Sequence, residues 1–316
     1  MRVLERRMSY VPGSARHAAP LSQRATPDAL IVGHLTRDLT PGGWRLGGPA
    51  LYAARTASLR GLRVAVVTSA AADVAAAARG VLPGVALRVV PSPTTTTFEN
   101  IYRDGERLQF LRAVAKPLRV CDIPRAWRAA PIVLLAPVAR EFNPSIAAAL
   151  RWVTLGLAPQ GWLRQWDANG RVCPAPLDAR AGDLFGSCAA LILSREDLTG
   201  PGATPDALAR AEETLRAWSA RTPCLVVTRG REGAELWRGG RVELFPAFPA
   251  HEMDPTGAGD VFAMTFLCAL AAGAPAELAV IEANQVAALS VEGSGVSAIP
   301  TPEAARAHFA ALHRDA

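Results

Sequence analysis

The stretch with the clearest chemical potential is Met253–Leu270, MDPTGAGDVFAMTFLCAL, where a turn leads into a long apolar helix. Gly257 and Gly259 have no Cβ, so the backbone can turn tightly and another molecule can approach its N–H groups. The first N–H groups of a helix lack internal partners, and the helix dipole adds partial positive charge there. The turn is therefore suited to an anion, most often a phosphate.

Asp260 needs a separate explanation, because its carboxylate would repel the same phosphate. When a phosphoryl group is transferred to a hydroxyl, a nearby carboxylate can accept the proton that the alcohol loses. Amides of the glycine turn would neutralise charge on the phosphoryl oxygens, and Mg²⁺ bridging the phosphates would reduce the repulsion. From the local pattern alone, a helix-capping role for Asp260 is an equally good interpretation.

The elements that must position this turn follow from the rest of the chain, where short apolar runs alternate with helical patterns. Such alternation is typical of a wound α/β sheet. Buried parallel strands are predicted at residues 29–33, 62–67, 131–136, 189–194 and 223–228. Helices are predicted at residues 49–60, 144–153, 206–220, 258–272 and 276–291. Ligands of such sheets bind beyond the carboxyl ends of the strands, where several glycine-bearing turns occur here.

One segment departs from the alternation. Residues 94–113, TTTTFENIYRDGERLQFLRA, form two β-rich runs joined through Asp104–Gly105, which is a strong hairpin signal. We interpret this segment as a flap of β-sheet beside the main domain. Residues 167–172 and 237–245 predict two further hairpins, which we interpret as ordinary edge structure.

Composition excludes several classes of function. The chain has 316 residues, 50% of them hydrophobic, and a net charge of +6, but its arginines are scattered, so no nucleic-acid partner is expected. The five cysteines are odd in number and form no C-x-x-C pair, which argues against a disulfide framework or a zinc site and for the cytoplasm. No apolar run approaches the roughly 18 residues of a membrane helix. Residues 1–27 lack the apolar region of a secretory signal, and we expect a disordered tail there.

The residues also carry a resemblance to a known family. DPTGAGD (254–260) resembles the D-T-x-G-A-G-D signature of the ribokinase (PfkB) family of carbohydrate kinases, with Pro255 in place of the usual threonine. Further segments resemble the family in order along the chain: GHLTRD (33–38), GGPALYAARTASLRG (47–61), LILSRED (191–197), VVTRGREGA (226–234) and ANQVAALSVEGSG (283–295). The inositol-kinase-like and uncharacterised branches are the most similar.

The resemblance implies a fold and a domain organisation. The fold would be a ribokinase-like wound, mostly parallel sheet with helices on both faces and a small β-sheet lid. Residues 28–316 would form one kinase domain, with the lid hairpin inserted at about residues 94–118. A homodimer formed through the lid is left open.

The resemblance also implies an activity: transfer of the γ-phosphate of ATP, with Mg²⁺, to a hydroxyl of a small sugar, polyol or inositol-like substrate. Asp260 would be the general base, and the amides of Gly257, Ala258 and Gly259 would form the anion hole. Acceptor contacts are implied for Asp38, Gly47, Gly48, Tyr52, Phe98, Asn100, Gln160 and Arg164. Nucleotide contacts are implied for Ser194, Thr228, Gly230, Gly233 and Asn284. Asp197 would lie near Mg²⁺, and Asp254 is linked to a monovalent cation such as K⁺, which is common but not universal in the family.

Several departures from the family pattern keep alternatives open. Ser194 and Asp197 stand where N-x-x-E is expected, and Tyr52 replaces an asparagine on the acceptor side. Arg164 is also interpretable as a solvated strand residue. A nucleoside kinase of the same fold, with Phe98 and Tyr102 as an aromatic clamp, is one alternative. A nucleotide-binding regulator without catalysis is another.

Overall fold

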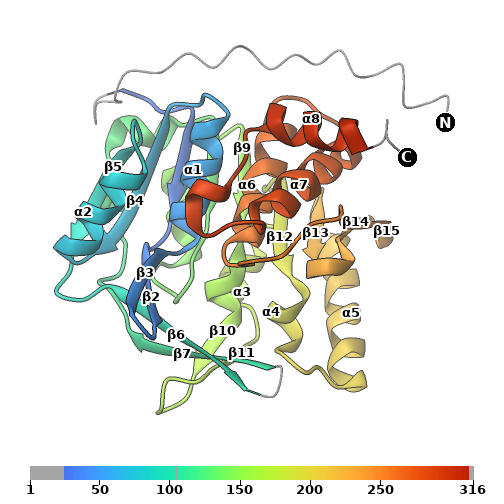
Figure 1. Ribbon diagram of the computed structural model, residues 1–316, viewed down its shortest axis with the longest axis horizontal. Coiled ribbons are helices and arrows are strands. Elements are labelled where there is room, and N and C mark those ends of the chain that lie inside the picture. Colours follow the sequence, from blue (N-terminus) through green and yellow to red (C-terminus); the bar gives the residue numbers. More distant parts are fainter. Residues whose placement is uncertain (1–24, 104–105, 313–316) are drawn as a thin grey trace.

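A nine-stranded sheet runs through the centre of the computed structural model, which describes residues 25–103 and 106–312 (Figure 1). Its strands are β1 (Ala29–Val32), β4 (Val64–Ala70), β5 (Ala86–Pro91), β8 (Ile132–Leu135), β9 (Thr154–Leu157), β12 (Ala190–Ser194), β13 (Leu225–Thr228), β14 (Ala234–Arg238) and β15 (Arg241–Phe245). The spatial order is β15-β14-β13-β12-β9-β8-β1-β4-β5. Pairing is parallel from β5 across to β13, whereas β14 and β15 extend the sheet antiparallel.

Helices cover both faces of this sheet because its central strands are apolar on both sides. In β1, Ile31 packs into one core and Leu30 and Val32 into the other, and all three side chains are fully buried. The first core is closed by α1 (Pro49–Leu59), α2 (Ala72–Val81), α6 (Ala258–Ala271), α7 (Ala276–Ser290) and α8 (Pro302–Leu312). The second is closed by α3 (Ala179–Gly182), α4 (Arg195–Thr199), α5 (Pro205–Ser219) and several 3-10 segments.

A smaller four-stranded sheet lies at the lower edge of the view in Figure 1. It consists of β2 (Thr36–Thr40), β3 (Gly43–Gly47), β6 (Thr96–Arg103) and β7 (Glu106–Ala113), in the order β3-β2-β6-β7. We call it the lid sheet. Its central pair, β2 and β6, is parallel, and the outer pairs are antiparallel. A separate hairpin pairs β10 (Arg164–Trp166) with β11 (Val172–Pro174).

Most of the expected elements are present, and the exceptions are informative. The five predicted strands correspond to β1, β4, β8, β12 and β13. The helix predicted over residues 144–153 is wrong: a 3-10 helix spans Pro144–Ala149 and is followed by β9. Pairing of β9 between β8 and β12 outweighs the local helical pattern, because the sheet needs a strand at that place. The β2–β3 hairpin was not anticipated.

Other expectations fall partly on residues that the structure leaves undescribed. These include residues 1–24 of the predicted tail and the Asp104–Gly105 turn of the flap. In the described part of the chain, no helix combines the length and apolar character required to cross a bilayer.

Candidate active site

A cleft of about 1010 Å³ lies where the carboxyl ends of the parallel strands meet the lid sheet. Ligand pockets commonly have volumes of about 300–1,000 Å³. Nearly all of the predicted site residues line it: Asp38, Gly48, Tyr52, Phe98, Asn100, Gln160, Arg164, Ser194, Asp197, Thr228, Gly230, Gly233, Gly257, Ala258, Gly259, Asp260 and Asn284. Gly47 and Asp254 lie beside the cleft instead of in its wall. Segments more than 200 residues apart in the sequence are thus brought to one place.

The head of α6 forms one wall of the cleft. Gly257 has a left-handed backbone, with φ of 81°, and a Cβ there would come within 2.4 Å of the Tyr52 ring, so only glycine fits. Among the described residues, the N–H groups of Gly257 and Gly259 have no hydrogen-bond partner, whereas that of Ala258 donates to the Pro255 carbonyl at 3.2 Å. Two free amides therefore stand at the positive end of a 14-residue helix.

Asp260 lies in the first turn of the same helix, facing the cleft. Its carboxylate accepts no hydrogen bond from the described part of the chain. Burial raises the pKa of Asp260 to about 7; the positive charge of Arg164 opposes this rise, and the charges of Asp197 and Asp38 add to it. A carboxylate that gains a proton near neutral pH is well matched to general-base chemistry.

Asp197 and Arg164 form a buried ion pair across the cleft. Arg164 Nη2 lies 3.7 Å from Asp197 Oδ1, with side-chain exposures of 11% and 7%. The other carboxylate oxygen, Oδ2, accepts from the Ser194 amide at 2.9 Å, which completes the capping box of α4. The alternative interpretation of Arg164 as a solvated strand residue is therefore wrong: β10 directs its side chain inward, where the guanidinium faces two carboxylates.

The acceptor side of the cleft combines Asp38 of β2 with Tyr52 of α1. Asp38 Oδ1 accepts from the Thr36 hydroxyl at 3.1 Å, and a Cβ on Gly47 would lie 2.3 Å from Asp38 Oδ2, so Gly47 makes room for this carboxylate. Burial raises the pKa of Tyr52 well above its usual value, and Asp254, Asp38 and Asp260 add to the rise. Tyr52 therefore remains a neutral phenol that can donate a hydrogen bond.

Residues of the lid sheet and of η4 (Pro159–Leu163) complete this side. Phe98 is 3% exposed and packs with Leu111 and Val138 in a small core of the lid. The Asn100 amide oxygen accepts from Gln109 Nε2 at 3.0 Å, and Gln160 lines the cleft opposite them. The side chain of Tyr102 lies outside the described residues.

The predicted nucleotide contacts line the same cleft. Thr228 ends β13, and Gly230 and Gly233 follow it in a turn with positive φ angles. Asn284 Nδ2 donates to the carbonyls of Phe245 and Pro246 at 3.4 and 3.3 Å. Its amide thus anchors the segment after β15 while still bordering the cleft.

A magnesium site would have to use few protein ligands. Within the described ranges, no group of three or more His, Cys, Asp or Glu side chains is arranged to hold a metal ion. Mg²⁺ usually binds through one or two carboxylates, with water and substrate phosphate oxygens completing its octahedron. Asp197 lines the cleft, but its carboxylate already faces Arg164 and the Ser194 amide, so its chemistry fits a contact with Mg²⁺ through a water ligand.

The sequence did not point to several residues that shape the site. Glu141 is 2% exposed, and its carboxylate accepts from the amides of His34, Val138 and Ala139 at 2.7–3.0 Å. It therefore ties the segment that leads into the lid sheet to the end of β8. Two others, Arg45 and Ser294, both contact Asp254. Ser294 lies in a glycine-rich segment visible in the sequence, whereas nothing in the pattern distinguishes Arg45.

A wound sheet, a small second sheet beside the cleft, and free amides with a carboxylate at the head of one helix form an arrangement suited to phosphoryl transfer. The family model described as pfkB family carbohydrate kinase matches residues 181–304. An inositol 3-kinase of Oryza sativa subsp. japonica is 30% identical over 300 residues, which cover 85% of this chain and 69% of the relative. The chain belongs to the pfkB family of carbohydrate kinases and is a phosphotransferase with an alcohol group as acceptor.

Other relatives and solved structures agree with this family and fold. A cytidine kinase of Thermococcus kodakarensis is 27% identical over 268 residues, covering 79% of this chain and 91% of the relative. A pyrophosphate-dependent kinase in the ribokinase family, solved with a pyrophosphate analog and myo-inositol, has a TM-score of 0.71 at 22% identity and covers 86% of this chain and 99% of its own. Arabidopsis thaliana ribokinase, solved with ribose and ATP, has a TM-score of 0.64 at 20% identity and covers 89% and 98%. The expected ribokinase-like fold is confirmed.

Proposed function

We propose that this protein transfers the γ-phosphate of ATP to a hydroxyl of a small sugar, polyol or inositol-like substrate, with Asp260 as the general base. The observation that carries the proposal is the carboxylate of Asp260, which has no hydrogen bond in the described structure and stands beside the free amides of Gly257 and Gly259. Acceptor deprotonation and phosphoryl charge neutralisation then occur at adjacent points.

Each group in the cleft has a defined task in this reaction. The acceptor hydroxyl attacks the γ-phosphorus, its proton passes to Asp260, and the bond to the bridging oxygen of ADP breaks. The two amides at the head of α6 donate hydrogen bonds to the phosphoryl oxygens, and Arg164 adds positive charge. Mg²⁺, held mainly by the donor phosphates with Asp197 near its water ligands, would supply further charge neutralisation.

The donor is proposed to be a nucleotide because the cleft continues past the anion-binding turn. Small side chains, Ala287 and Ala288 of α7, line that extension near Asn284, which leaves room for a base. Arabidopsis ribokinase was solved with ATP, whereas the neighbour with the TM-score of 0.71 is pyrophosphate-dependent. Pyrophosphate is therefore the competing donor.

The acceptor is proposed to be a ring or chain of hydroxyls. The cleft presents the Asp38 carboxylate, the Tyr52 phenol and the Gln160 amide, which are typical partners of hydroxyl groups. The inositol 3-kinase relative favours a polyol, and the cytidine kinase relative favours the nucleoside alternative. The tight packing of Phe98 with Leu111 and Val138 leaves less of its ring for stacking on a base, which supports the polyol.

A donor and acceptor panel tests the proposal. Purified protein is offered Mg·ATP or Mg·pyrophosphate with myo-inositol, ribose, hexoses, linear polyols, cytidine and adenosine, and formation of the phosphorylated product is followed. Turnover of a polyol or sugar with ATP, abolished in Asp260→Asn and retained in the exposed control Asp183→Asn, is the expected result. Turnover of nucleosides alone would favour the second candidate. ATP binding without turnover of any acceptor would favour the regulator.

Three further features remain proposals of the same model. The first is that the hairpin of β6 and β7, inserted in a kinase domain of residues 28–316, acts as part of a lid over the acceptor. The second is a homodimer formed through the lid sheet. The third is a cytoplasmic location. The cysteine pattern predicts that location, and all five cysteines are free.

A further inference from the structure

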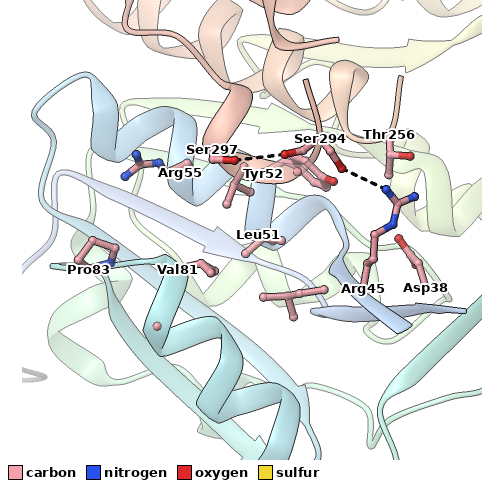
Figure 2. A pocket seen from close by; sticks show the side chains of 14 residues that line it. Asp38, Arg45, Leu51, Tyr52, Arg55, Val81, Pro83, Thr256, Ser294 and Ser297 are labelled. Atoms are coloured by element: carbon pink, nitrogen blue, oxygen red, sulfur yellow. Dashed lines mark hydrogen bonds between the residues drawn. The ribbon is translucent and has the colours of Figure 1, made fainter. Parts of the chain in front are cut away.

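The carboxylate of Asp254 is already engaged on both oxygens. Oδ2 accepts from Arg45 Nη1 at 2.7 Å and from the Ser294 hydroxyl at 3.2 Å. Oδ1 accepts from the Thr256 amide at 3.1 Å. Arg45 Nη1 also donates to Ser294 Oγ at 3.2 Å, a contact that Figure 2 marks with a dashed line, so Arg45, Ser294 and Asp254 are all in mutual contact. A charged donor at 2.7 Å makes the contact with Arg45 the strongest of the set.

This arrangement does not fit the monovalent cation that the family resemblance implies at Asp254. A cation needs lone pairs directed at it, but three of the roughly four lone-pair sites of this carboxylate face N–H and O–H donors. The carbonyl of Val291 is occupied by the amides of Met253 and Asp254, at 2.8 and 3.1 Å. A second positive charge would also be repelled by the guanidinium.

The arginine comes from a different part of the molecule than its partners. Arg45 lies on β3 of the lid sheet, directly opposite Asp38 of β2 in the strand register. Asp254 begins the turn that leads to Gly257, and Ser294 follows α7. The guanidinium thus connects the strand pair that carries the proposed acceptor contact to the turn that carries the anion hole. Figure 2 shows Arg45 extending from the lid sheet toward Thr256 and Ser294.

The turn depends on this connection. Asp254 Oδ1 fixes the Thr256 amide, and Gly257 follows immediately. The side chain of Asp254 is 13% exposed, so its charge is better compensated by a partner than by water. Half of the Arg45 side chain is exposed, at 52%. A cation from solvent can therefore take the place of the guanidinium when the side chain is shortened.

We propose that Arg45 supplies, from within the chain, the positive charge at Asp254 that a monovalent cation would otherwise provide, and that it positions the anion-hole turn against the lid sheet. Arg45 is a positioning residue that acts through Asp254. The proposal rests on the proposed function only for its kinetic consequences. The binding of cations at Asp254 is independent of turnover.

The test compares the wild type with Arg45→Gln in chloride salts of potassium, sodium and tetramethylammonium at equal ionic strength. Tetramethylammonium is too large to take the place of potassium or sodium, and it has no N–H with which to replace the guanidinium. Thermal unfolding of the wild type should be the same in all three salts, whereas Arg45→Gln should gain a rise in Tm specific to potassium or sodium. On the best acceptor, kcat/KM of Arg45→Gln should fall by about tenfold in tetramethylammonium and recover partly in potassium.

Controls separate this role from general stabilisation of the lid. Arg112→Gln removes another arginine from the lid sheet, one that pairs with Glu99, and should show no cation response. Arg45→Lys should keep the activity independent of added cations, and it serves if Arg45→Gln does not fold. A wild-type enzyme that needs potassium would overturn the proposal, as would an Arg45→Gln protein whose Tm ignores the cation. The Tm measurements test the role of Arg45 even if no acceptor turns over. Failure of the proposed function can therefore be distinguished from failure of this proposal.

Discussion

The two acids that bound the seven-residue motif, Asp254 and Asp260, are treated in opposite ways by the fold. Burial alone would raise the pKa of Asp254, but hydrogen bonds from Thr256 and Ser294 and the charge of Arg45 lower it below its usual value. Burial raises the pKa of Asp260 to about 7, and no hydrogen bond from the described residues offsets it. The same residue type is held as a permanent anion at one end and near its titration point at the other.

The difference shows how a short turn can combine rigidity with reactivity. Asp254 is outside the cleft, and its bonds organise the backbone that precedes Gly257. Asp260 faces the cleft, where any fixed donor would compete with the acceptor proton. Each satisfied bond on Asp254 helps to hold the free amides in place, and each missing bond on Asp260 leaves a lone pair for chemistry.

The largest effect is expected for Asp260→Asn. Loss of the general base should reduce kcat by at least about a hundredfold, since such removal typically costs 10²–10⁴, while ATP affinity changes little. Steady-state kinetics and calorimetric titration of ATP measure the two quantities. Asp254→Asn should reduce kcat by only about tenfold, because it weakens the support of the turn but leaves the general base, Asp260, in place. Equal losses in the two variants would remove the distinction between the acids.

Asp260→Asn should raise the stability of the protein above neutral pH, although it lowers the activity. The folded-state pKa of Asp260 lies above the ordinary value of 3.8, so wild-type stability falls as pH rises from 3.8 through about 7. Asp260→Asn does not titrate, so its Tm should exceed that of the wild type at pH 8 and match it more closely near pH 4. A lower Tm at pH 8 would show that the carboxylate is better satisfied than the structure indicates.

The next effect concerns the contact between Tyr52 and the turn. Gly257→Ala places a Cβ within 2.4 Å of the Tyr52 ring at a φ of 81°, whereas Gly273→Ala has a φ of 84° and open space. The control isolates the backbone cost, about 1–2 kcal/mol, and the additional clash should bring Gly257→Ala to about 3 kcal/mol. Denaturant unfolding measures both. Similar values for the two variants would mean that the ring moves away freely.

Much of this arrangement could be predicted because it depends on local sequence. Apolar β-branched runs identify the buried strands, and the glycines of GAGD identify the turn at the head of α6 without reference to distant residues. Arg45 and Glu141 could not be found in this way, because their partners are distant in the sequence. Arg45 bonds to Asp254, 209 residues away, and Glu141 accepts from His34, 107 residues away. The failed helix at residues 144–153 has the same cause, because β9 exists only through pairing with its neighbours.

The pH dependence of the rate sharpens the comparison further. Asp260 must be unprotonated to accept the hydroxyl proton, so kcat/KM should rise with pH and level off above about 7, with activity at pH 6 about tenfold lower than at pH 8. Arg164→Met removes the charge that lowers this pKa, and the rising limb should then move to higher pH. Arg112→Gln, which alters a residue that neither lines the cleft nor contributes to the pKa shift of Asp260, should leave the limb in place. A limb near pH 4 in the wild type would contradict the desolvated carboxylate.

The smallest effect is expected for Ser294→Ala, which tests how much support Asp254 needs. The variant removes one neutral hydrogen bond of 3.2 Å and leaves the bonds from Arg45 and Thr256. A neutral hydrogen bond contributes about 1 kcal/mol, so kcat/KM should fall by no more than about fivefold, and the pH limb of Asp260 should not move. Ser297→Ala, whose hydroxyl donates to the Ser294 carbonyl, is the matched control and should be closer to wild type. If Ser294→Ala instead matched Asp254→Asn, the serine and not the arginine would be the main partner of the acid, and the guanidinium would be a secondary contact.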